Sequence, residues 1–252
     1  MKMTQIQFNE LAKLHEKWLN TDGKCGNRLI LNGEDLSYIR MANKNLAKCI
    51  LTDCNICKTD CKNTNFEEAD LSESCIAHSD CSGANFRSAN LENAYCAETC
   101  FDNTNFEKSN ISYGRFSLAT FIKSNLSYAK AIESNFESCD MSYVFAKSAN
   151  FNNSNMTNVS LYCSDLNHAR LSEVILTNSN LDDANLLNTD FRYSDLSGCD
   201  LQTDTSVAWL EGASTRGAIL RLTDEIKGYD IPDDCKVDKT ISRKNPEPVY
   251  AL

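Results

Sequence analysis

The sequence is poor in the residues that usually mark tight turns, cofactor loops and membrane spans. Its 252 residues include only 9 glycines and 3 prolines, although asparagine and serine are abundant. Neither of the two common glycine-rich nucleotide signatures, G-x-x-x-x-G-K-[ST] and G-x-G-x-x-G, occurs. No stretch approaches the roughly 18 consecutive apolar residues of a membrane span. The segment MKMTQIQFNELAKLHEKWL lacks the apolar run of a signal peptide, so we expect a cytoplasmic protein.

Basic charge is also in short supply. Lys and Arg together number 25 against 35 Asp and Glu, which gives a formal net charge of −10. A general nucleic-acid binder needs an excess of Lys and Arg to contact phosphates, so this composition argues against direct binding to DNA or RNA. It is compatible with a basic protein partner, including an enzyme that itself binds DNA. The length suits one large domain or two small ones.

What the sequence has instead is an apolar residue at every fifth position. The series runs from Leu31 through Cys61, Phe101 and Leu161 to Leu201, which is 35 consecutive pentads without a slip in register. Two positions before each of these, from Cys49 onward, the residue is Ala, Ser, Thr, Cys, Val or a single Gly. One position before, Asn or Asp dominates, as in TNF, ADL and ANF. The repeating unit is therefore small, Asn or Asp, large apolar, and two variable residues.

A period of five fits neither a helix, which repeats near 3.6 residues, nor a strand, which repeats at two. It fits a chain that turns a corner once per pentad and points two side chains inward. Four such corners close a square coil of 20 residues, and successive coils would pair as parallel strands about 4.8 Å apart. The inward residue next to the large one must be small because both share a narrow interior. Asn and Asp suit the corner, where their side chains can bond nearby amides.

This pattern resembles the A(D/N)LXX consensus of the pentapeptide-repeat family over residues 29–203. The resemblance implies an all-β solenoid, a right-handed quadrilateral parallel β-helix of about nine coils. Several members of that family act on DNA gyrase and topoisomerase IV and protect them from topoisomerase poisons. They are acidic rods, usually dimers through a terminal helix, that occupy the DNA-binding saddle of the enzyme. This chain lacks the loops that project from the coil in some of those members.

We expect the two ends of the chain to cap the solenoid, because terminal coils otherwise leave core and strand edges open. Residues 1–28 are predicted to form a capping helix over 4–20, with Thr4 as N-cap, and an entry loop. The expected apolar face of this helix consists of Phe8, Leu11, Leu14, Trp18 and Leu19. This helix is expected to act as a lid, with dimerisation as the alternative.

Residues 204–252 form the predicted C-terminal cap, with a short helix near 215–227 followed by an extended arm or a tail. A homodimer is predicted through this region. The residues expected to make cap or dimer contacts are Trp209, Leu210, Ile219, Leu220 and Leu222.

The stretch CNICKTDC at residues 54–61 has a spacing that invites a metal or redox interpretation. In the pentad register, Cys54 and Cys61 point inward and Cys57 points outward, so their thiolates cannot converge on one zinc ion. Seven of the 13 cysteines hold inward positions, where Cys acts as a small hydrophobic residue. These are Cys49, Cys54, Cys61, Cys81, Cys96, Cys139 and Cys199. We expect mostly free thiols, no metal and no cofactor.

The three histidines, His15, His78 and His168, are far apart in the coil register. No Cys–His or Ser–His–Asp arrangement can assemble among them, so we expect no enzymatic activity. The outward-facing thiols Cys75, Cys100 and Cys163 are scattered in this register.

Function must then lie on the outer surface, where two of the four faces carry more acid than base. The first acidic face surrounds Met41, Cys61 and every twentieth residue onward; it carries seven acidic residues against three basic ones. Its candidate binding residues are Asp60, Asp80, Asp102, Asp140, Tyr143, Tyr162, Asp182, Asp183 and Asp200. The second acidic face surrounds Leu31, Leu51 and onward, with the same balance. Its candidates are Asp53, Asp70, Glu73, Glu92, Tyr113, Glu133, Glu173 and Asp190.

Two functions fit such a rod. The first is a DNA-shaped decoy for a DNA-processing enzyme such as DNA gyrase or topoisomerase IV. A rod of roughly 40 Å would match duplex DNA with about 24 phosphates, so the mimicry of charge is partial. The second is a protein-interaction scaffold or regulator that uses a face or the C-terminal arm. Exposed tyrosines would then be binding anchors, although tyrosine also simply favours strands.

Overall fold

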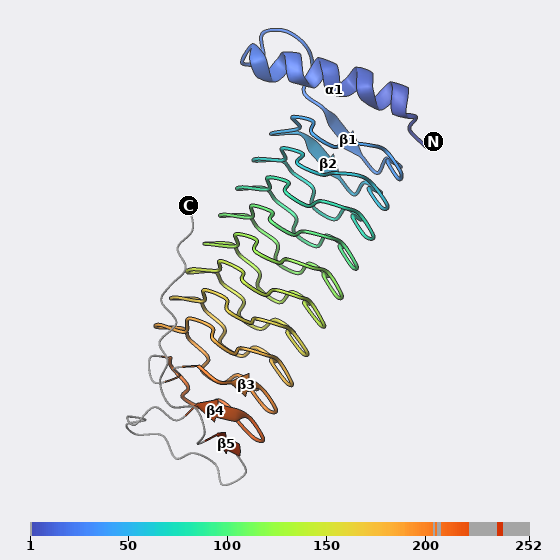
Figure 1. Cartoon of the computed structure of the whole chain (residues 1–252). Coiled ribbons are helices and arrows are strands. Elements are labelled where there is room, and N and C mark those ends of the chain that lie inside the picture. Colours follow the sequence, from blue (N-terminus) through green and yellow to red (C-terminus); the bar gives the residue numbers. More distant parts are fainter. Residues whose placement is uncertain (1, 204, 206–207, 222–235, 239–252) are drawn as a thin grey trace.

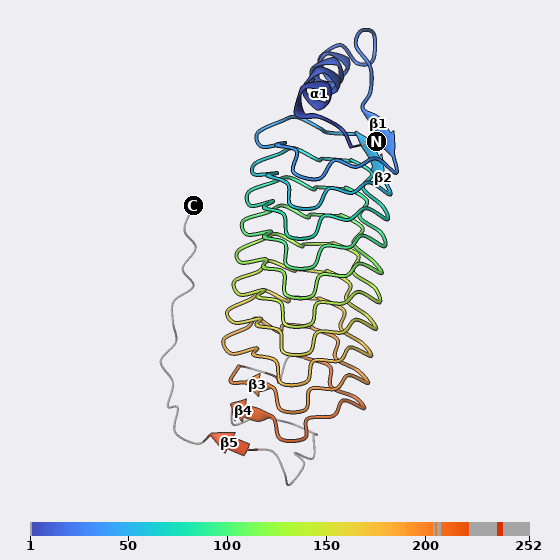
Figure 2. The ribbon, with the colours of Figure 1, turned by 90° about the vertical axis from the view of Figure 1, so that its right-hand side faces the viewer.

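The structure is a computed structural model that describes residues 2–203, 205, 208–221 and 236–238. These residues form a long rod, with helix α1 (Gln5–Asn20) lying across its N-terminal end (Figures 1 and 2). Behind the helix the chain winds into flat coils whose bridge partners are twenty residues apart, as in Asp35–Asn55 and Asn55–Cys75. The predicted right-handed quadrilateral β-helix is confirmed.

Backbone hydrogen bonds join each coil to the next on all four faces. On the face of Phe86, the Phe86 N–H donates to the Asn105 carbonyl at 2.7 Å, and the Asn105 N–H donates to the Ala84 carbonyl at 3.0 Å. The ladder is parallel and short on each face, because the chain turns away after one pentad. Only at the ends does it lengthen into strands, first β1 (Ile30–Asn32) paired with β2 (Ile50–Thr52).

Every corner uses the same left-handed backbone conformation. From Gly33 to Gly198, each fifth residue has a positive φ, between 52° and 71°. Most of these residues are not glycine, and many are asparagine, which tolerates this region better than other side chains do. The corner is closed by a bond such as Ala89 N–H to the Phe86 carbonyl at 3.0 Å. A chain with few glycines can thus turn many corners, because each one is fixed by ladder bonds on both sides.

The two other recurring features of the pentad also have structural reasons. The Asn or Asp before the large residue accepts the N–H two positions on, as from Glu67 to Asn65 Oδ1 at 3.1 Å. This confirms the predicted role of that residue at the corner. The small inward residue is often Ser, Thr or Cys because its side chain reaches the carbonyl of a large residue one coil earlier. Ser154 Oγ donates to the Ala131 carbonyl at 2.6 Å, and Cys139 Sγ donates to the Phe116 carbonyl at 2.9 Å.

The core is a column of large inward side chains. Phe66, Phe86 and Phe106 stack with ring centroids 4.9 and 5.0 Å apart on one face. On a second face Phe101 stacks on Phe121 at 5.1 Å. All are essentially fully buried. Stacking of like residues follows directly from the twenty-residue coil, because each ring lies above its counterpart.

Helix α1 begins as predicted and packs differently from the prediction. Thr4 is the N-cap, with a capping box to Gln7. The residues that α1 buries are Phe8, Ala12 and His15, whereas Leu14 is 41 % exposed. The buried face of α1 is therefore turned about the helix axis relative to the predicted face. The prediction used apolar residues alone and left out His15, which is buried and hydrogen-bonded. Among the described residues, no helix has the length and apolar content needed to cross a membrane.

The coil continues beyond residue 203, where the sequence predicted a cap with a helix near 215–227. Strand β3 (Asp200–Leu201) pairs in parallel with β4 (Ile219–Arg221), which pairs with β5 (Lys236–Asp238). The prediction of a helix is therefore wrong at residues 219–221, which form a strand. In this last coil the bridge partners are nineteen residues apart, as in Asp190–Trp209 and Asp195–Ser214.

The last coil was not predicted from the sequence, because this coil is one residue shorter than the others and the five-residue register shifts by one. Shifted by one, the pentads AWLEG, ASTRG and AILRL place three alanines at the small inward position. Ala218 is fully buried, and Ala208 and Leu210 pack against the core. Trp209 lies on the outer surface at 53 % exposure, and Ile219 is half-buried in β4. Leu220 lies in β4, while Leu222 and most of the predicted arm lie outside the described residues.

Candidate interaction surface

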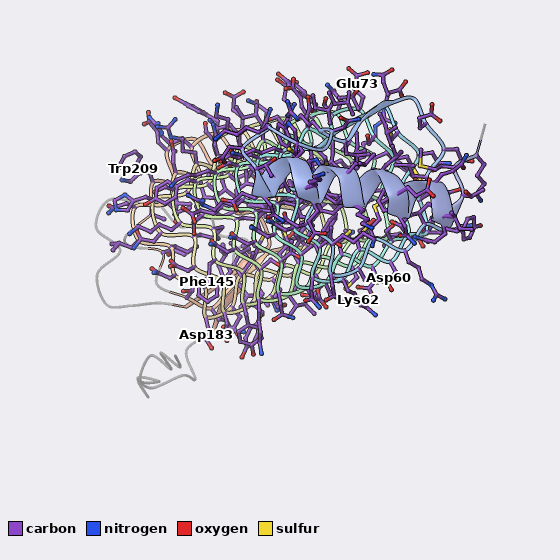
Figure 3. The ribbon with its side chains drawn as sticks, turned by 90° about the horizontal axis from the view of Figure 1, so that it is seen from above. Asp60, Lys62, Glu73, Phe145, Asp183 and Trp209 are labelled. Carbon is purple, nitrogen blue, oxygen red and sulfur yellow. A yellow bond between two sulfur atoms is a disulfide. The ribbon has the colours of Figure 1, made fainter. Side chains whose placement is uncertain are left out.

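The first acidic face forms three adjacent columns of outward side chains. Its bridge column runs through Asp60, Asp80, Asp140 and Asp200, which are joined by in-register parallel bridges along the rod. The predicted gathering of these carboxylates on one face therefore follows from the coil. Figure 3 shows Asp60, Lys62 and Asp183 along one side of the rod, with Glu73 on the opposite side.

The N-terminal half of this face is partly neutralised. Lys62 Nζ lies 2.9 Å from Asp80 Oδ2. Burial raises the pKa of Asp80, but hydrogen bonds from Ser82 and Lys62 outweigh it, so this pKa lies below its usual value. Asp102 Oδ1 accepts the backbone N–H of Ile122 at 3.0 Å. These acids are held in place by the coil, and their charge is partly compensated.

The C-terminal half combines acids with a pair of aromatic rings. Tyr143 and Tyr162, on adjacent coils, pack edge to face with their ring centroids 5.6 Å apart, and Tyr143 is 43 % exposed. A hydrogen bond with Cys163, with further contributions from the charges of neighbouring groups including Asp183, raises the pKa of Tyr162 to about 12. Tyr162 therefore presents a neutral hydroxyl, and the two packed rings present apolar surface beside carboxylates.

The acids around the tyrosines also anchor the coil. Asp140 Oδ1 accepts the Ser142 N–H at 3.0 Å, and Asp200 Oδ1 accepts the Gln202 N–H at 3.3 Å. Asp140 uses this oxygen for the corner, whereas Asp200 also accepts the Gln202 side-chain amide on its other oxygen, Oδ2, at 3.2 Å. Asp182 and Asp183 lie on the coil after Tyr162, where the Cys163 N–H donates to the Asp182 carbonyl at 3.0 Å.

The second acidic face is mixed in character. Its acids Asp53, Glu73, Glu133 and Glu173 are exposed corner residues with positive φ. Asp190 is only 8 % exposed and binds Arg192 through two contacts of 2.8 Å. The Arg192 hydrogen bond is the main reason that the pKa of Asp190 lies below its usual value.

Two of the remaining candidates of this face accept hydrogen bonds from nearby residues, and the third is an exposed tyrosine. Asp70 Oδ1 accepts from Ser72 at 3.1 Å, and Glu92 Oε2 accepts from the Asn110 amide at 3.0 Å. Tyr113 is 46 % exposed.

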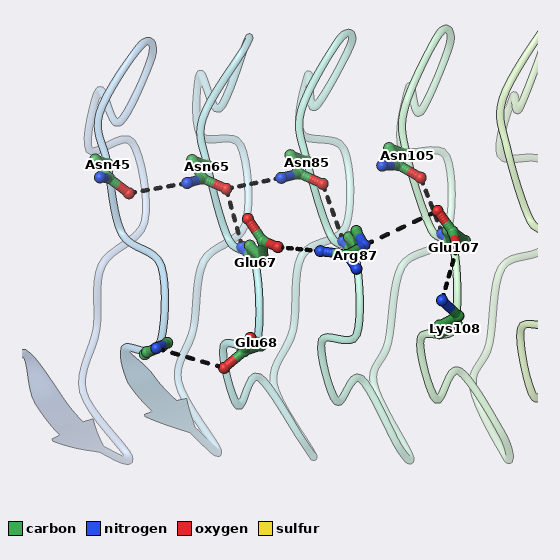
Figure 4. Close-up of polar contacts among 10 residues, drawn as sticks. Asn45, Asn65, Glu67, Glu68, Asn85, Arg87, Asn105, Glu107 and Lys108 are labelled. Carbon is green, nitrogen blue, oxygen red and sulfur yellow. Dashed lines mark hydrogen bonds and ion pairs between the residues drawn. The ribbon is translucent and has the colours of Figure 1, made fainter. Parts of the chain in front are cut away.

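A third face is occupied by its own side-chain ladders (Figure 4). Asn45, Asn65 and Asn85 bond amide to amide along the rod at 3.0 Å each. Beside them, Arg87 bridges Glu67 at 2.6 Å and Glu107 at 3.9 Å. These charges satisfy one another, which makes this face a weaker candidate for a charged partner. On the same face Phe145, 54 % exposed, stands where the ladder otherwise has a polar residue.

The inward cysteines lie where the sequence placed them, while one outward pair forms a contact that was not foreseen. All seven inward thiols are at most 2 % exposed, which confirms their role as small core residues. Cys57 and Cys75, however, form a disulfide with their Cα atoms 5.8 Å apart. Their spacing of 18 residues brings them together on adjacent coils, so the expectation of scattered outward thiols is wrong for Cys75. No cluster of metal-ligating side chains occurs within the part of the chain that the structure describes.

Comparison with known proteins places these features in a wider group. The family model described as pentapeptide repeats matches eight copies, which together run from residue 35 to residue 202. No curated protein sequence shows significant similarity to the chain.

Two solved structures are among those similar to this chain. The first is HetL from the cyanobacterium Nostoc sp. strain PCC 7120, a pentapeptide repeat protein involved in heterocyst differentiation regulation; it has 23 % identity, covers 81 % of this chain and 94 % of its own, and has a TM-score of 0.46. The second is full-length QnrB1, a plasmid-mediated fluoroquinolone resistance protein. It has 16 % identity, covers 75 % of this chain and 92 % of its own, and has a TM-score of 0.49.

Proposed function

Since the chain belongs to the pentapeptide-repeat family, we propose that it is a non-enzymatic rod that binds a basic protein partner through its first acidic face. The partner that we propose is a DNA-processing enzyme such as DNA gyrase or topoisomerase IV, in the cytoplasm, where the rod would act as a decoy. Binding would then inhibit the enzyme or protect it from topoisomerase poisons.

The observation that carries the proposal is the arrangement around Tyr143 and Tyr162. Interface anchors are typically aromatic residues held in place near the centre of a patch and surrounded by polar groups. Here two rings are fixed against each other. Asp140 lies on the coil of Tyr143, and Asp182 and Asp183 lie on the coil that follows Tyr162. Such a patch offers apolar area for affinity and negative charge for attracting a basic surface.

The dimensions support a DNA-binding partner. Bridge partners from Asp35 to Ser214 form one column of ten residues, so the rod is roughly 43 Å long at about 4.8 Å per coil. Duplex DNA of that length carries about 25 phosphates. The first acidic face has seven acidic residues, fewer than a single DNA strand would present. The proposed mimicry therefore depends on shape and on a few well-placed charges.

The decisive experiment measures binding to purified gyrase and topoisomerase IV together with supercoiling and poison-stabilised cleavage. The test variant is Asp140→Asn/Asp183→Asn/Asp200→Asn, in which Asn keeps the corner hydrogen bonds. Its matched control is Glu73→Gln/Glu133→Gln/Glu173→Gln, which removes the same charge from the opposite face. We expect the test variant to weaken binding about tenfold or more, and the control to change it by less than about twofold.

A second variant isolates the aromatic anchor. Tyr162→Ser removes the ring without changing the charge, and a central anchor residue is worth about 2 kcal/mol, or roughly thirtyfold in Kd. Unchanged supercoiling and cleavage at about 10 μM wild-type protein would rule out the topoisomerase partner. Equal losses in the two triple variants would rule out the first acidic face as the binding surface.

Solution mass provides an independent check on the geometry. A dimer joined end to end through the C-terminal region would double the rod to about 86 Å, which favours a decoy for a long DNA-binding saddle. A monomer at all concentrations would favour the alternative, a scaffold that holds a partner on one face. Light scattering over a dilution series distinguishes the two.

A further inference from the structure

A groove lined mainly by basic and neutral residues lies along one edge of the second acidic face, near the C-terminal end. It has a volume of about 780 Å³, within the usual range for ligand sites. One wall is the bridge column Lys130, Asn150, Arg170, Asp190 and Trp209, in which each residue pairs with the next. The other wall consists of corner residues, which protrude because of their positive φ. These are Tyr128, Ser148, His168 and Asn188.

The charge in this groove is positive, although the protein as a whole is acidic. Its lining includes Lys130, Arg170 and Arg192 against the single carboxylate of Asp190. Asp190 is nearly buried and accepts from Nε and Nη2 of Arg192, so its charge is already compensated. The ion pairs among the described residues do not include Lys130 or Arg170. Two exposed cations therefore remain to attract an anion.

Two amide side chains of the groove, Asn150 and Asn152, have their oxygens occupied and can act as donors. Asn150 Oδ1 accepts the Asn152 N–H at 3.1 Å, and Asn152 Oδ1 accepts the Ser172 N–H at 3.1 Å. Each oxygen is engaged by the coil, so each amide can offer its NH₂ group to a ligand. A row of NH₂ donors between an ammonium and a guanidinium is complementary to carboxylate oxygens.

The end of the groove is rigid. The Arg192 guanidinium lies 5.5 Å from the Trp209 ring centroid while it also holds Asp190. Trp209 itself is 53 % exposed and lies away from Asp60 and Asp183 in Figure 3. A bound segment would therefore meet a fixed aromatic surface at one end and Tyr128, 50 % exposed, at the other.

We propose that this groove is a second binding site, which takes an acidic peptide segment with two or more carboxylates. Lys130 and Arg170 are two coils apart, about 9.6 Å, which an extended peptide spans with about three residues. A nucleic acid fits less well, because its affinity depends on many Lys and Arg contacts along the phosphate backbone, whereas this groove offers two exposed cations. This site is independent of the first acidic face and would let one rod hold a basic and an acidic surface together.

The test uses the full chain and a fluorescein-labelled hexaglutamate peptide, followed by fluorescence anisotropy at about 50 mM salt. The groove variant is Lys130→Gln/Arg170→Gln. Its matched control is Lys13→Gln/Lys123→Gln, which removes two exposed lysines elsewhere and changes the net charge equally. We expect the groove variant to bind about tenfold more weakly, as loss of charge-assisted hydrogen bonds implies, and the control to change by less than about twofold.

A second readout places the peptide in the groove. In a Trp18→Phe background the emission comes from Trp209, and we expect hexaglutamate to shift it with the same Kd as the anisotropy. Equal weakening in both double variants, or no saturable binding at about 1 mM protein, would overturn the site. Tighter binding of oligothymidylate than of hexaglutamate would overturn the assignment of a peptide ligand. None of these outcomes depends on gyrase, so failure here is distinct from failure of the proposed function.

Discussion

His15 Nδ1 accepts a hydrogen bond from the backbone N–H of Leu29 at 3.1 Å, and this contact joins helix α1 to the start of the first coil. The other ring nitrogen, Nε2, lies 2.9 Å from the Ala47 carbonyl oxygen and must therefore donate. The buried imidazole is thus the neutral tautomer protonated at Nε2. One side chain ties the cap to both the start and the end of the first coil.

This arrangement predicts that docking of α1 weakens in acid. Burial is the main reason that the pKa of His15 lies below its usual 6.5. Because the unfolded chain binds a proton more readily than the folded one, the stability from His15 is complete above pH 6.5 and is lost as the pH falls toward the lower folded pKa. Trp18, whose ring stacks on His15 at 5.6 Å, reports docking by fluorescence in a Trp209→Phe background.

The matched variant for this effect is His15→Gln. A Gln amide can accept from Leu29 and donate to Ala47, yet it does not titrate between pH 4 and 8. We expect it to remain docked over this range, whereas His168→Gln should keep the wild-type pH dependence. A wild-type profile that stays flat from pH 8 to pH 5 would contradict the buried neutral tautomer.

The Cys57–Cys75 disulfide should stabilise the early coils. Closing a loop of this length contributes about 3 kcal/mol in the chain-entropy model. Cys57→Ser and Cys75→Ser should lower the melting temperature of oxidised protein equally, while Cys100→Ser should leave it unchanged. Peptide mapping after alkylation without reduction should find this pair linked; if both thiols are alkylated in air-oxidised protein, the pairing is wrong.

A buried charge at Cys61 should disrupt the coils around it. Cys61 is 1 % exposed, with Thr59 Oγ1 3.2 Å from its sulfur. Cys61→Asp should cost several kcal/mol because the carboxylate would lack compensating donors, whereas Cys61→Ala should cost less. Denaturant unfolding measures both. Chelators should leave the wild-type curve unchanged, and stoichiometric zinc in the purified protein would contradict the assignment of Cys61 as a core residue.

Gly114 should not tolerate a methyl group. A Cβ at this inward position would lie 2.9 Å from the Ile111 carbonyl oxygen and still closer to the Phe116 ring. That ring stacks on Phe136 at 5.1 Å, so it cannot move without disturbing the core. Gly114→Ala should destabilise the protein by about 1–3 kcal/mol in urea unfolding, although alanine is buried at the equivalent Ala119. An unchanged midpoint would show that the core around Phe116 has spare room.

Much of this architecture could be predicted because the five-residue period acts locally. An inward large residue such as Phe86 and an inward small one such as Ala84 can share a narrow coil only if the chain turns at each pentad. The positions of Asp60 and Asp80 on one face then follow by counting. The same count separates the two histidines and four cysteines that face outward from the coil from the seven core cysteines.

The last coil could not be predicted in this way, because it is one residue shorter. The five-residue register then shifts in the sequence, although the coil still forms. Backbone bonds such as Phe191 N–H to the Trp209 carbonyl, at 2.9 Å, restore the stacking after the shift. Ala208, Ala213 and Ala218 carried the signal, since they repeat at five once the register is moved.

The sequence alone determined the solenoid, its faces and the identity of its core, since each depends on residues within one pentad or on multiples of twenty. Only the tertiary structure decided which surface groups meet. The rise between coils brings Cys57 to Cys75, the docking of α1 buries His15 against Leu29, and the shifted last coil sets Trp209 beside Arg192. These contacts depend on how one coil lies against the next, and that distance and phase are fixed by packing between segments rather than by any single repeat.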